Sequence, residues 1–221
     1  GPMHGGAAGE ALRRAGAALR LGERAVQLDG EGVRLEGGEL LEGDAVVVAV
    51  PPEESARLLS EPDPGLGASP IVSVHLLLDR QLLRHPVAGL LGSPAHWLFD
   101  RGLLTGRPPA EGQYLTVVSS GAPELLAIRG RELVELIAGA LAERLGPAEL
   151  LWSRVSREPR ATFAARPGTL RLRPGAETAW PNVARAGAWT QTGWPATMES
   201  AVASGRRAAL LLAKMATKVA A

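Results

Sequence analysis

Residues 186–205 read AGAWTQTGWPATMESAVASG, and this stretch decides which fold we expect. A short apolar strand at 183–186 leads into it, and a glycine-containing turn follows. From Pro195 to about Lys214 the sequence predicts a helix, since proline is tolerated in a first helical turn. The start of such a helix suits an anion, because backbone N–H groups and the positive dipole end gather there, but an ordinary capped helix has the same pattern. Small residues on one face favour close packing of this helix on a sheet, and they are Ala201, Val202, Gly205, Ala208 and Ala209.

Upstream, short apolar runs separated by glycines occupy the first 60 residues. They predict a small antiparallel meander with tight turns, preceded by a short helix at 10–15. The strands of this meander are expected at 19–21, 24–28, 33–35 and 39–41. Residues 45–50 are a continuous run of β-forming residues and predict a buried strand. Two prolines end that strand, and a short helix is expected at 53–59.

The middle of the chain predicts a second, antiparallel sheet. Residues 62–70 have the composition of a linker, and alternation at 71–78 indicates a strand with apolar residues on both faces. Residues 131–145 are the clearest helix, because an apolar stripe recurs at helical spacing and a Gly-Pro pair stops it. We expect this helix to cover one face of the sheet. Further strands are expected at 89–91, 96–99, 114–119 and 149–156, and a loop at 167–181.

Composition excludes several classes of protein. The 221 residues contain no cysteine, which excludes disulfides and thiolate chemistry, and the net charge of +1 without a basic cluster argues against nucleic acid as a partner. The four histidines lack metal-binding spacing, so we expect no metal. No apolar run is long enough to span a membrane. We therefore expect a cytoplasmic protein, with peripheral contact at the inner membrane face as the alternative.

Several segments carry a resemblance to a known family. They include the turn at Gly187, the strand at 45–52, and the segments at 69–76, 97–102 and 158–164. In their order and spacing they resemble the amine-oxidase and phytoene-desaturase superfamily over roughly residues 11–209. The most similar subfamily is the squalene-associated FAD-dependent desaturases, which includes the hydroxysqualene dehydroxylases. The chain is identified as resembling the C-terminal half of such a protein, because no G-x-G-x-x-G occurs in it.

The resemblance implies an α/β fold of the α+β kind with two territories. Residues 8–60 and 176–221 would be pieces of a flavin domain, namely the β-meander, a buried strand and the C-terminal helix. Residues 61–175 would form a substrate domain, an antiparallel sheet with a covering helix.

The resemblance also assigns an ancestral flavin contact to the turn before the C-terminal helix. The family usually reads Gly-Asp-Trp where this chain reads Gly187-Ala188-Trp189, so a carboxylate that meets the flavin is replaced by a methyl group. We therefore expect FAD to be the family's cofactor but not to be bound by this chain alone. The tryptophans of the turn fit core packing equally well. The implied contact residues are Gly187, Ala188, Trp189, Gly193, Trp194, Pro195, Ala196 and Thr197.

An apolar substrate pocket is expected in the second territory. One face of the strand at 71–78 is assigned to the covering helix, so the other face needs either more core or a ligand. By resemblance the ligand would be an apolar isoprenoid. No catalytic residue can be assigned. The expected lining residues are Ser73, His75, Trp97, Phe99 and Tyr114.

Two hypotheses of function follow. The first is a flavin-dependent isoprenoid oxidoreductase in which a separate flavin-domain protein supplies the dinucleotide-binding half. The second is a flavin-free module that binds an isoprenoid or a partner, or processes a terpenoid without redox chemistry; Ala188 favours it. Exposed strand edges left by a missing half would promote either a complex with that flavin-domain protein or a homo-oligomer.

Overall fold

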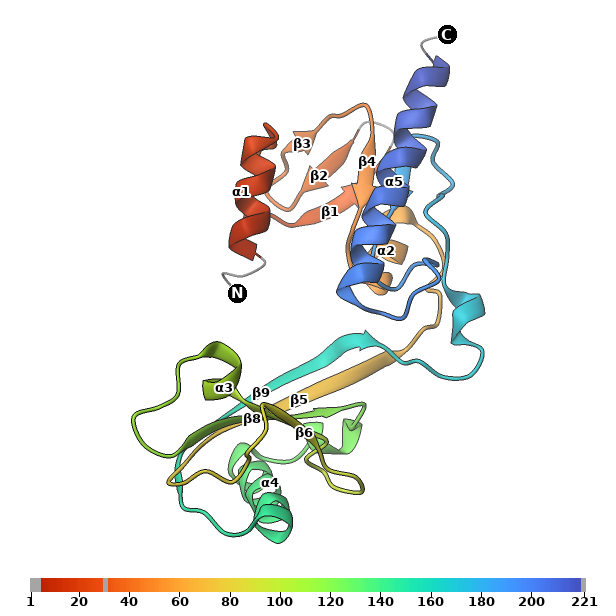
Figure 1. The fold of residues 1–221 in the computed structure, drawn as a ribbon. Coiled ribbons are helices and arrows are strands. Elements are labelled where there is room, and N and C mark those ends of the chain that lie inside the picture. The colour runs from red at the N-terminus through yellow and green to blue at the C-terminus, as the bar shows by residue number, and fades with distance from the viewer. Residues whose placement is uncertain (1–4, 30–31, 220–221) are drawn as a thin grey trace. The chain divides into compact units, whose positions relative to one another are not determined.

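The computed structural model describes residues 5–29 and 32–219, which fall into two compact units (Figure 1). The first unit combines the chain up to Pro64 with Pro174–Gly193 and the residues from Thr197 onward. The second unit comprises Gly65–Arg173 and Trp194–Ala196. Each unit has its own hydrophobic core, and each is described by itself.

The first unit begins with helix α1 (Ala7–Arg14) and the predicted meander. Its strands are β1 (Ala25–Leu28), β2 (Val33–Leu35) and β3 (Leu40–Leu41), paired antiparallel in chain order. The strand expected at 19–21 is wrong, since these residues are irregular and exposed. Arg20 within them forms ion pairs with Glu23 and Glu39 instead, which tie the segment to the meander through side chains.

A parallel strand pair and two helices complete this unit. Strand β4 (Val46–Val48) leads to helix α2 (Pro52–Leu59) and pairs in parallel with β10 (Val183–Arg185). The expectation that 45–50 is buried throughout needs correction, because Val47 is 42% exposed while Val48 is buried. A two-stranded sheet covered on one face leaves alternate side chains open to solvent.

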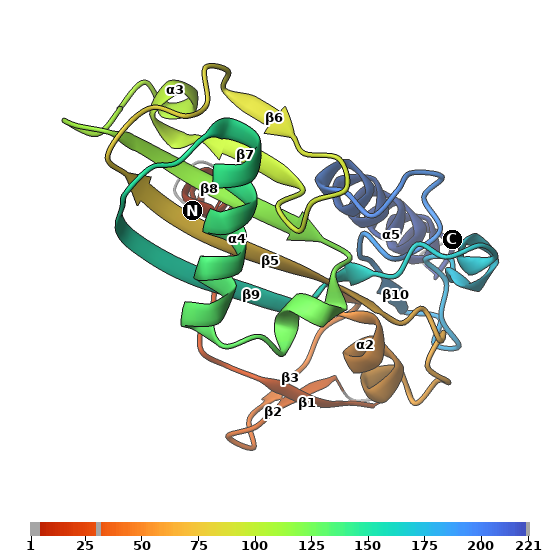
Figure 2. The ribbon, with the colours of Figure 1, turned by 90° about the horizontal axis from the view of Figure 1, so that it is seen from below.

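Helix α5 (Met198–Val219) packs against β10 (Figure 2), as the sequence predicted, but with a different face. Of the five small residues expected on the packing face, Ala208 is fully buried, whereas Ala201, Val202 and Ala209 are exposed. Two serines take the inner positions. The buried face of α5 consists of Ser200, Ser204, Ala208 and Leu212.

The second unit is built on a five-stranded antiparallel sheet with the order β6-β7-β8-β5-β9. The central strand β5 pairs with β8 on one side and with the edge strand β9 on the other. Helix α4 (Gly130–Leu145) lies across one face, as Figure 2 shows. The strands are β5 (Ala68–Leu78), β6 (Val87–Gly89), β7 (Trp97–Asp100), β8 (Gln113–Ser120) and β9 (Leu150–Phe163).

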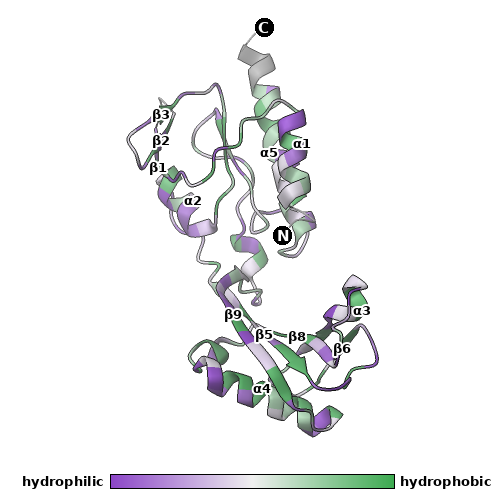
Figure 3. Ribbon diagram, turned by 90° about the vertical axis from the view of Figure 1, so that its left-hand side faces the viewer, coloured by the Kyte–Doolittle hydropathy of each residue, from purple (hydrophilic) through white to green (hydrophobic). Residues whose placement is uncertain are grey.

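The core of the second unit lies between this sheet and α4. Alternate residues of β5 point into it, and the predicted apolar stripe of α4 meets them. Coloured by hydropathy, β8 is largely hydrophobic, while β9 and α4 carry residues of both kinds (Figure 3). This confirms the prediction of an antiparallel sheet with one covering helix. The core residues from these elements include Val72, Val74, Leu76, Leu78, Leu133, Val134, Ile137 and Leu141.

Three features of this unit differ from expectation. Strand β5 starts at Ala68, inside the predicted linker, and β9 continues to Phe163. Pro159 is tolerated in β9 because that strand lies at the sheet edge, where a missing N–H costs no ladder bond. The sequence also gave no sign of helix α3 (Arg101–Thr105), which Asp100 caps by accepting a hydrogen bond from the Leu103 N–H. Two 3-10 helices, η2 (Pro123–Leu126) and η3 (Thr169–Leu172), complete the unit.

Across the residues that the structure describes, no helix combines the length and the apolar character needed to cross a bilayer.

Candidate functional site

The sheet of the second unit has an outer face, opposite the one that α4 covers. Side chains of directly opposed residues in a sheet share a face, so the strand register defines its members. His75 of β5 lies opposite Thr116 of β8, and Thr116 lies opposite Phe99 of β7. On the other side, His75 lies opposite Arg154 of β9. The outer face therefore comprises Ser73, His75, Leu77, Trp97, Phe99, Tyr114, Thr116, Val118, Trp152, Arg154 and Ser156.

All five residues predicted for the substrate pocket come from three strands and lie on this outer face. Ser73, His75, Phe99 and Tyr114 are half-buried, and Trp97 is 51% exposed. The residues are thus brought together on one surface. Their role as a substrate site stays a prediction.

His75 is held near the middle of the outer face. Its Nδ1 lies 3.1 Å from Oγ1 of the buried Thr116, a hydrogen bond whose direction depends on the ring tautomer. Its ring centroid is 6.3 Å from that of Tyr114. Partial burial lowers the pKa of His75, and the positive charges of Arg101 and Arg154 lower it further. The imidazole is therefore held in its neutral form.

A pocket of about 390 Å³ opens at the end of the outer face where β5 ends and β8 begins. Tyr114 and Trp152 meet there edge to face, with ring centroids 6.3 Å apart. Trp152 remains 48% exposed, so the pocket is an open hollow rather than an enclosed cavity. Its lining is mostly apolar and consists of Leu77, Arg107, Pro108, Pro109, Tyr114 and Trp152.

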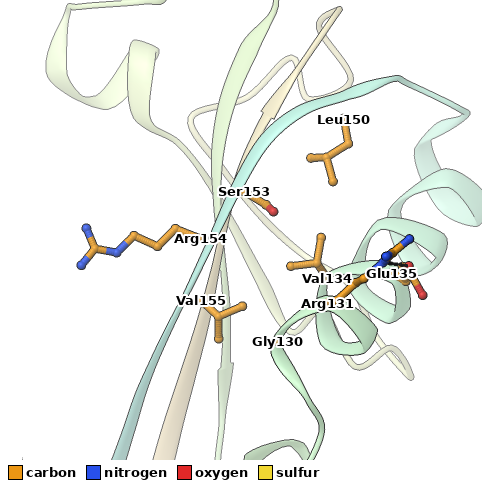
Figure 4. Close-up of a pocket in the computed structure, with 8 residues that line it drawn as sticks. All are labelled: Gly130, Arg131, Val134, Glu135, Leu150, Ser153, Arg154 and Val155. Carbon is orange, nitrogen blue, oxygen red and sulfur yellow. Dashed lines mark hydrogen bonds and ion pairs between the residues drawn. The ribbon is translucent and has the colours of Figure 1, made fainter.

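A second pocket lies on the opposite side of the sheet, between α4 and the edge strand β9 (Figure 4). It measures about 480 Å³, and an ion pair of 3.1 Å between Arg131 and Glu135 borders it. Figure 4 shows the Arg154 side chain extending away from α4, as its place on the outer face requires. No sequence pattern predicted this second pocket.

In the first unit, the turn after β10 is fixed by contacts that involve Gly187 and Trp189. Gly187 has a φ of +153°, and a Cβ added to it would lie 2.4 Å from Nε1 of Trp189. That Nε1 donates a hydrogen bond to the carbonyl of Val50, just after β4. Only glycine fits this position beside the anchored indole ring. Trp189 is thus a packed residue of this unit, as one of its two expected roles required.

Buried hydroxyl groups connect the same turn to α5, and the sequence analysis missed them. Oγ of Ser204 accepts a hydrogen bond from the Gly187 N–H, and Oγ of Ser200 donates to the Ala188 carbonyl. Thr192 and Ser200 share a further hydrogen bond of 2.6 Å. The spacing of four residues between the serines, which places both on one helical face, was the signal available in the sequence.

The fit of this turn to a flavin is partial. Ala188 offers no side-chain hydrogen bond, and the N–H groups of Gly187, Thr190 and Gln191 are engaged by other residues of the same unit. Gly193 and Thr197 belong to this first unit, whereas Trp194–Ala196 belong to the second, where Arg173 donates to the Trp194 carbonyl. The backbone N–H groups of Gly187, Thr190 and Gln191 are therefore already engaged within the protein and are not available to a bound anion.

Within 5–29 and 32–219, no three metal-ligating side chains of the His, Cys, Asp and Glu types gather in one place. His4 lies outside the described residues.

Comparison with known proteins connects both regions to one family. Residues 7–212 match the family described as flavin containing amine oxidoreductase. A hydroxysqualene dehydroxylase of Sinorhizobium fredii is 38% identical over 176 residues, which cover 75% of this chain and 38% of that protein. One from Rhodopseudomonas palustris is 38% identical over 174 residues, covering 76% and 38%. The chain thus matches well under half the length of these curated relatives.

Solved structures share the fold at low sequence identity. A putative protoporphyrinogen oxidase from an Exiguobacterium species has a TM-score of 0.70 at 14% identity, covering 91% of this chain and 48% of that one. An oxidoreductase from Methanosarcina mazei has a TM-score of 0.68 at 18% identity, covering 91% and 52%. These likenesses support the mixed α/β fold with its antiparallel sheet.

Proposed function

Because this chain belongs to the family of flavin-containing amine oxidoreductases, we propose that it supplies the substrate-binding part of an FAD-dependent oxidoreductase acting on a squalene-type isoprenoid. The names of the relatives from two bacteria support this substrate class. Segments that hold the FAD phosphates lie outside these 221 residues under this proposal, whether in a longer chain or in a second polypeptide.

The outer face of the second unit is the observation that carries the proposal. It combines the aromatic side chains Trp97, Phe99, Tyr114 and Trp152 with interspersed polar side chains, and apolar surfaces with a few placed polar groups are how proteins hold small apolar ligands. The pocket beside Tyr114 and Trp152 gives an apolar chain a place to start, and the face extends from it along β5 and β8. These residues would bind the chain, orient it and keep water from the reacting carbon.

FAD, when bound, supplies the hydride chemistry, and the protein contributes binding and orientation. The turn at 187–193 would contact one flank of the flavin through its backbone, in the arrangement that the Gly187 and Ser204 hydrogen bond fixes. We assign no proton transfer to a residue of this turn.

Ligand binding tests the proposal directly. Squalene-type ligands should raise the melting temperature of the chain, because a ligand that binds only the native state stabilises it. Ser73→Trp should abolish this shift, since an indole at the centre of the outer face occupies the space of the ligand. A matched control is Glu143→Trp on the exposed side of α4, which should bind like the parent. Absence of any shift with C15 to C30 isoprenoids would refute the proposal.

A second candidate function is a flavin-free isoprenoid-binding module, which Ala188 favours because it removes a carboxylate typical of the family. Turnover separates the two candidates. The oxidoreductase should convert hydroxysqualene when FAD, a reductant for the flavin and a dinucleotide-binding domain from a relative are supplied, because replacing the C–O bond of the alcohol by C–H takes up two electrons and releases water. The module should bind the same compound and leave it chemically unchanged under those conditions.

A further inference from the structure

His75 lies beside the aromatic end of the outer face. Its ring stands beside Tyr114, whose other side meets Trp152 in the pocket of about 390 Å³. Leu77 of the same strand lines that pocket as well. A hydrocarbon chain seated in the pocket would therefore continue along the strands directly past the imidazole.

One nitrogen of this ring is engaged and the other is available. Thr116 holds Nδ1 at 3.1 Å and so fixes the plane of the ring. Among the described residues, none forms a hydrogen bond with Nε2 of His75. If the threonine donates to Nδ1, Nε2 carries a proton and donates; in the other tautomer Nε2 accepts. A hydroxyl group both donates and accepts, so it complements either state.

The surroundings favour a neutral hydrogen-bonding partner. Burial and the charges of Arg101 and Arg154 lower the pKa of His75, so the imidazole is uncharged near neutral pH. Tyr114 and Thr116 also lie next to the ring, and each carries a hydroxyl group. An uncharged imidazole on a largely apolar surface discriminates between a hydrocarbon and its alcohol through a single hydrogen bond.

We propose that Nε2 of His75 binds the hydroxyl group of a hydroxylated isoprenoid chain on the outer face, and that this contact sets the preference for the alcohol over the hydrocarbon. The inference rests on the proposed function and goes further, because it names the residue and the chemical group that determine specificity. Thr116 acts as a positioning residue that orients the ring.

The experiment compares two ligands that differ by one hydroxyl. Dissociation constants of squalene and hydroxysqualene for the 221-residue chain are measured by fluorescence titration and by thermal shift. We expect hydroxysqualene to bind about three- to tenfold more tightly, the contribution of one neutral hydrogen bond. His75→Phe should remove this preference, because the phenyl ring carries no hydrogen-bonding nitrogen; the quantity compared is the ratio of the two dissociation constants, since the larger apolar ring can change the affinity for squalene itself.

Three further variants make the result specific. His75→Gln should retain part of the preference, since an amide can still bond a hydroxyl. Thr116→Val should weaken it by releasing the ring. His85→Gln, at an exposed position in the loop before β6, should leave both affinities unchanged. Should His75→Phe fail to fold, the comparison of the two ligands on the parent chain and on His75→Gln still decides the question.

Each other outcome has a defined meaning. Equal affinities of the parent chain for the two ligands, or a preference that survives in His75→Phe, would overturn this inference while the proposed function stands. Absence of binding by both ligands would overturn both. A further outcome concerns a charged ligand. If farnesyl diphosphate binds more than about tenfold more tightly than farnesol, the result would identify an anion site at Arg101 and Arg154 and would overturn the role given to His75.

Discussion

Gln113 at the start of β8 is a buried amide with every hydrogen-bonding position used. Its Oε1 accepts from the N–H groups of Leu82 and Leu83, at 2.8 and 2.9 Å. Its Nε2 donates to the Leu83 carbonyl and to the Asp100 carboxylate. This one side chain thus connects β8 to the loop after β5 and to the cap of α3.

Replacing Gln113 with leucine should destabilise the chain by about 2–4 kcal/mol, because two backbone N–H groups and a carboxylate oxygen would lose their partner in the interior. Urea unfolding measures the change. Gln81→Leu provides the control: its side chain is exposed and makes one hydrogen bond, so its cost should stay below about 1 kcal/mol. Equal costs of the two substitutions would contradict the role given to Gln113.

His75 should make stability depend on pH in a defined direction. Its pKa in the folded chain is lowered by burial and by Arg101 and Arg154, so the unfolded chain takes up the proton at higher pH than the folded chain does. Above the pKa of histidine in the unfolded chain, about 6.5, His75 therefore does not lower the free energy of unfolding. As the pH falls below that pKa, the unfolded chain binds the proton first, so the free energy of unfolding decreases.

Unfolding curves recorded between about pH 7.5 and pH 5 test this direction against the ordinary titration of histidine. The parent chain should lose stability over that range, and His75→Phe should lose less. Only the difference in slope is compared, since the substitution also changes packing. Parallel curves for the two proteins would show that His75 titrates alike in the folded and unfolded states.

At the scale of single elements, the turn between β10 and α5 depends on Gly187. Gly187→Ala should cost about 2 kcal/mol or more, because a methyl group would meet the Trp189 ring at a backbone angle that disfavours any Cβ. Gly205→Ala in α5 is the matched control, as a Cβ there meets nothing within 4 Å. That change should stabilise the helix by about 0.5–1 kcal/mol. Thermal unfolding of the two variants should thus shift in opposite directions, and equal shifts would contradict this account.

Elements with strict periodicity could be predicted from the sequence, and others could not. Alternation at 71–78 identified the buried face of β5, and the stripe on α4 identified its partner. The packing face of α5 was wrong except at Ala208, because the prediction considered small residues alone, whereas Ser200 and Ser204 are buried and bond the turn through their hydroxyl groups. Helix α3 was missed because its cap, Asp100, also ends a strand.

In the candidate site, too, the features set by the local sequence pattern could be predicted, and the contacts between distant segments could not. Ser73 and His75 could be placed on one face by counting along β5, and the register then joins Phe99 and Tyr114 to that face. The sequence could not reveal that Thr116 would bond the imidazole ring, or that residues 107–109 would line an open pocket beside Trp152. Both depend on strand pairing between segments more than 30 residues apart.

For the whole molecule, we expect the purified chain to carry no FAD. Tight flavin binding in this family's folds requires backbone N–H groups around the pyrophosphate, and no G-x-G-x-x-G motif is present in the 221 residues. Under the proposed function the turn at Gly187 contacts the flavin, but Ala188 has no carboxylate with which to form a side-chain hydrogen bond to it. The visible spectrum after gel filtration should therefore lack the flavin bands.

The variant Ala188→Asp separates the two reasons for expecting no bound FAD, which are the absence of a pyrophosphate-binding motif and the absence of a carboxylate at position 188. If phosphate binding is the decisive loss, the variant alone should remain colourless, because one neutral or charged hydrogen bond, about 1–3 kcal/mol, cannot replace the pyrophosphate contacts. Supplied with the dinucleotide-binding domain of a hydroxysqualene dehydroxylase, the variant should retain FAD about tenfold or more tightly than the parent chain does. Stoichiometric flavin on the parent chain alone would contradict the expectation. It would also mean that residues other than a G-x-G-x-x-G turn hold the pyrophosphate of FAD in this chain.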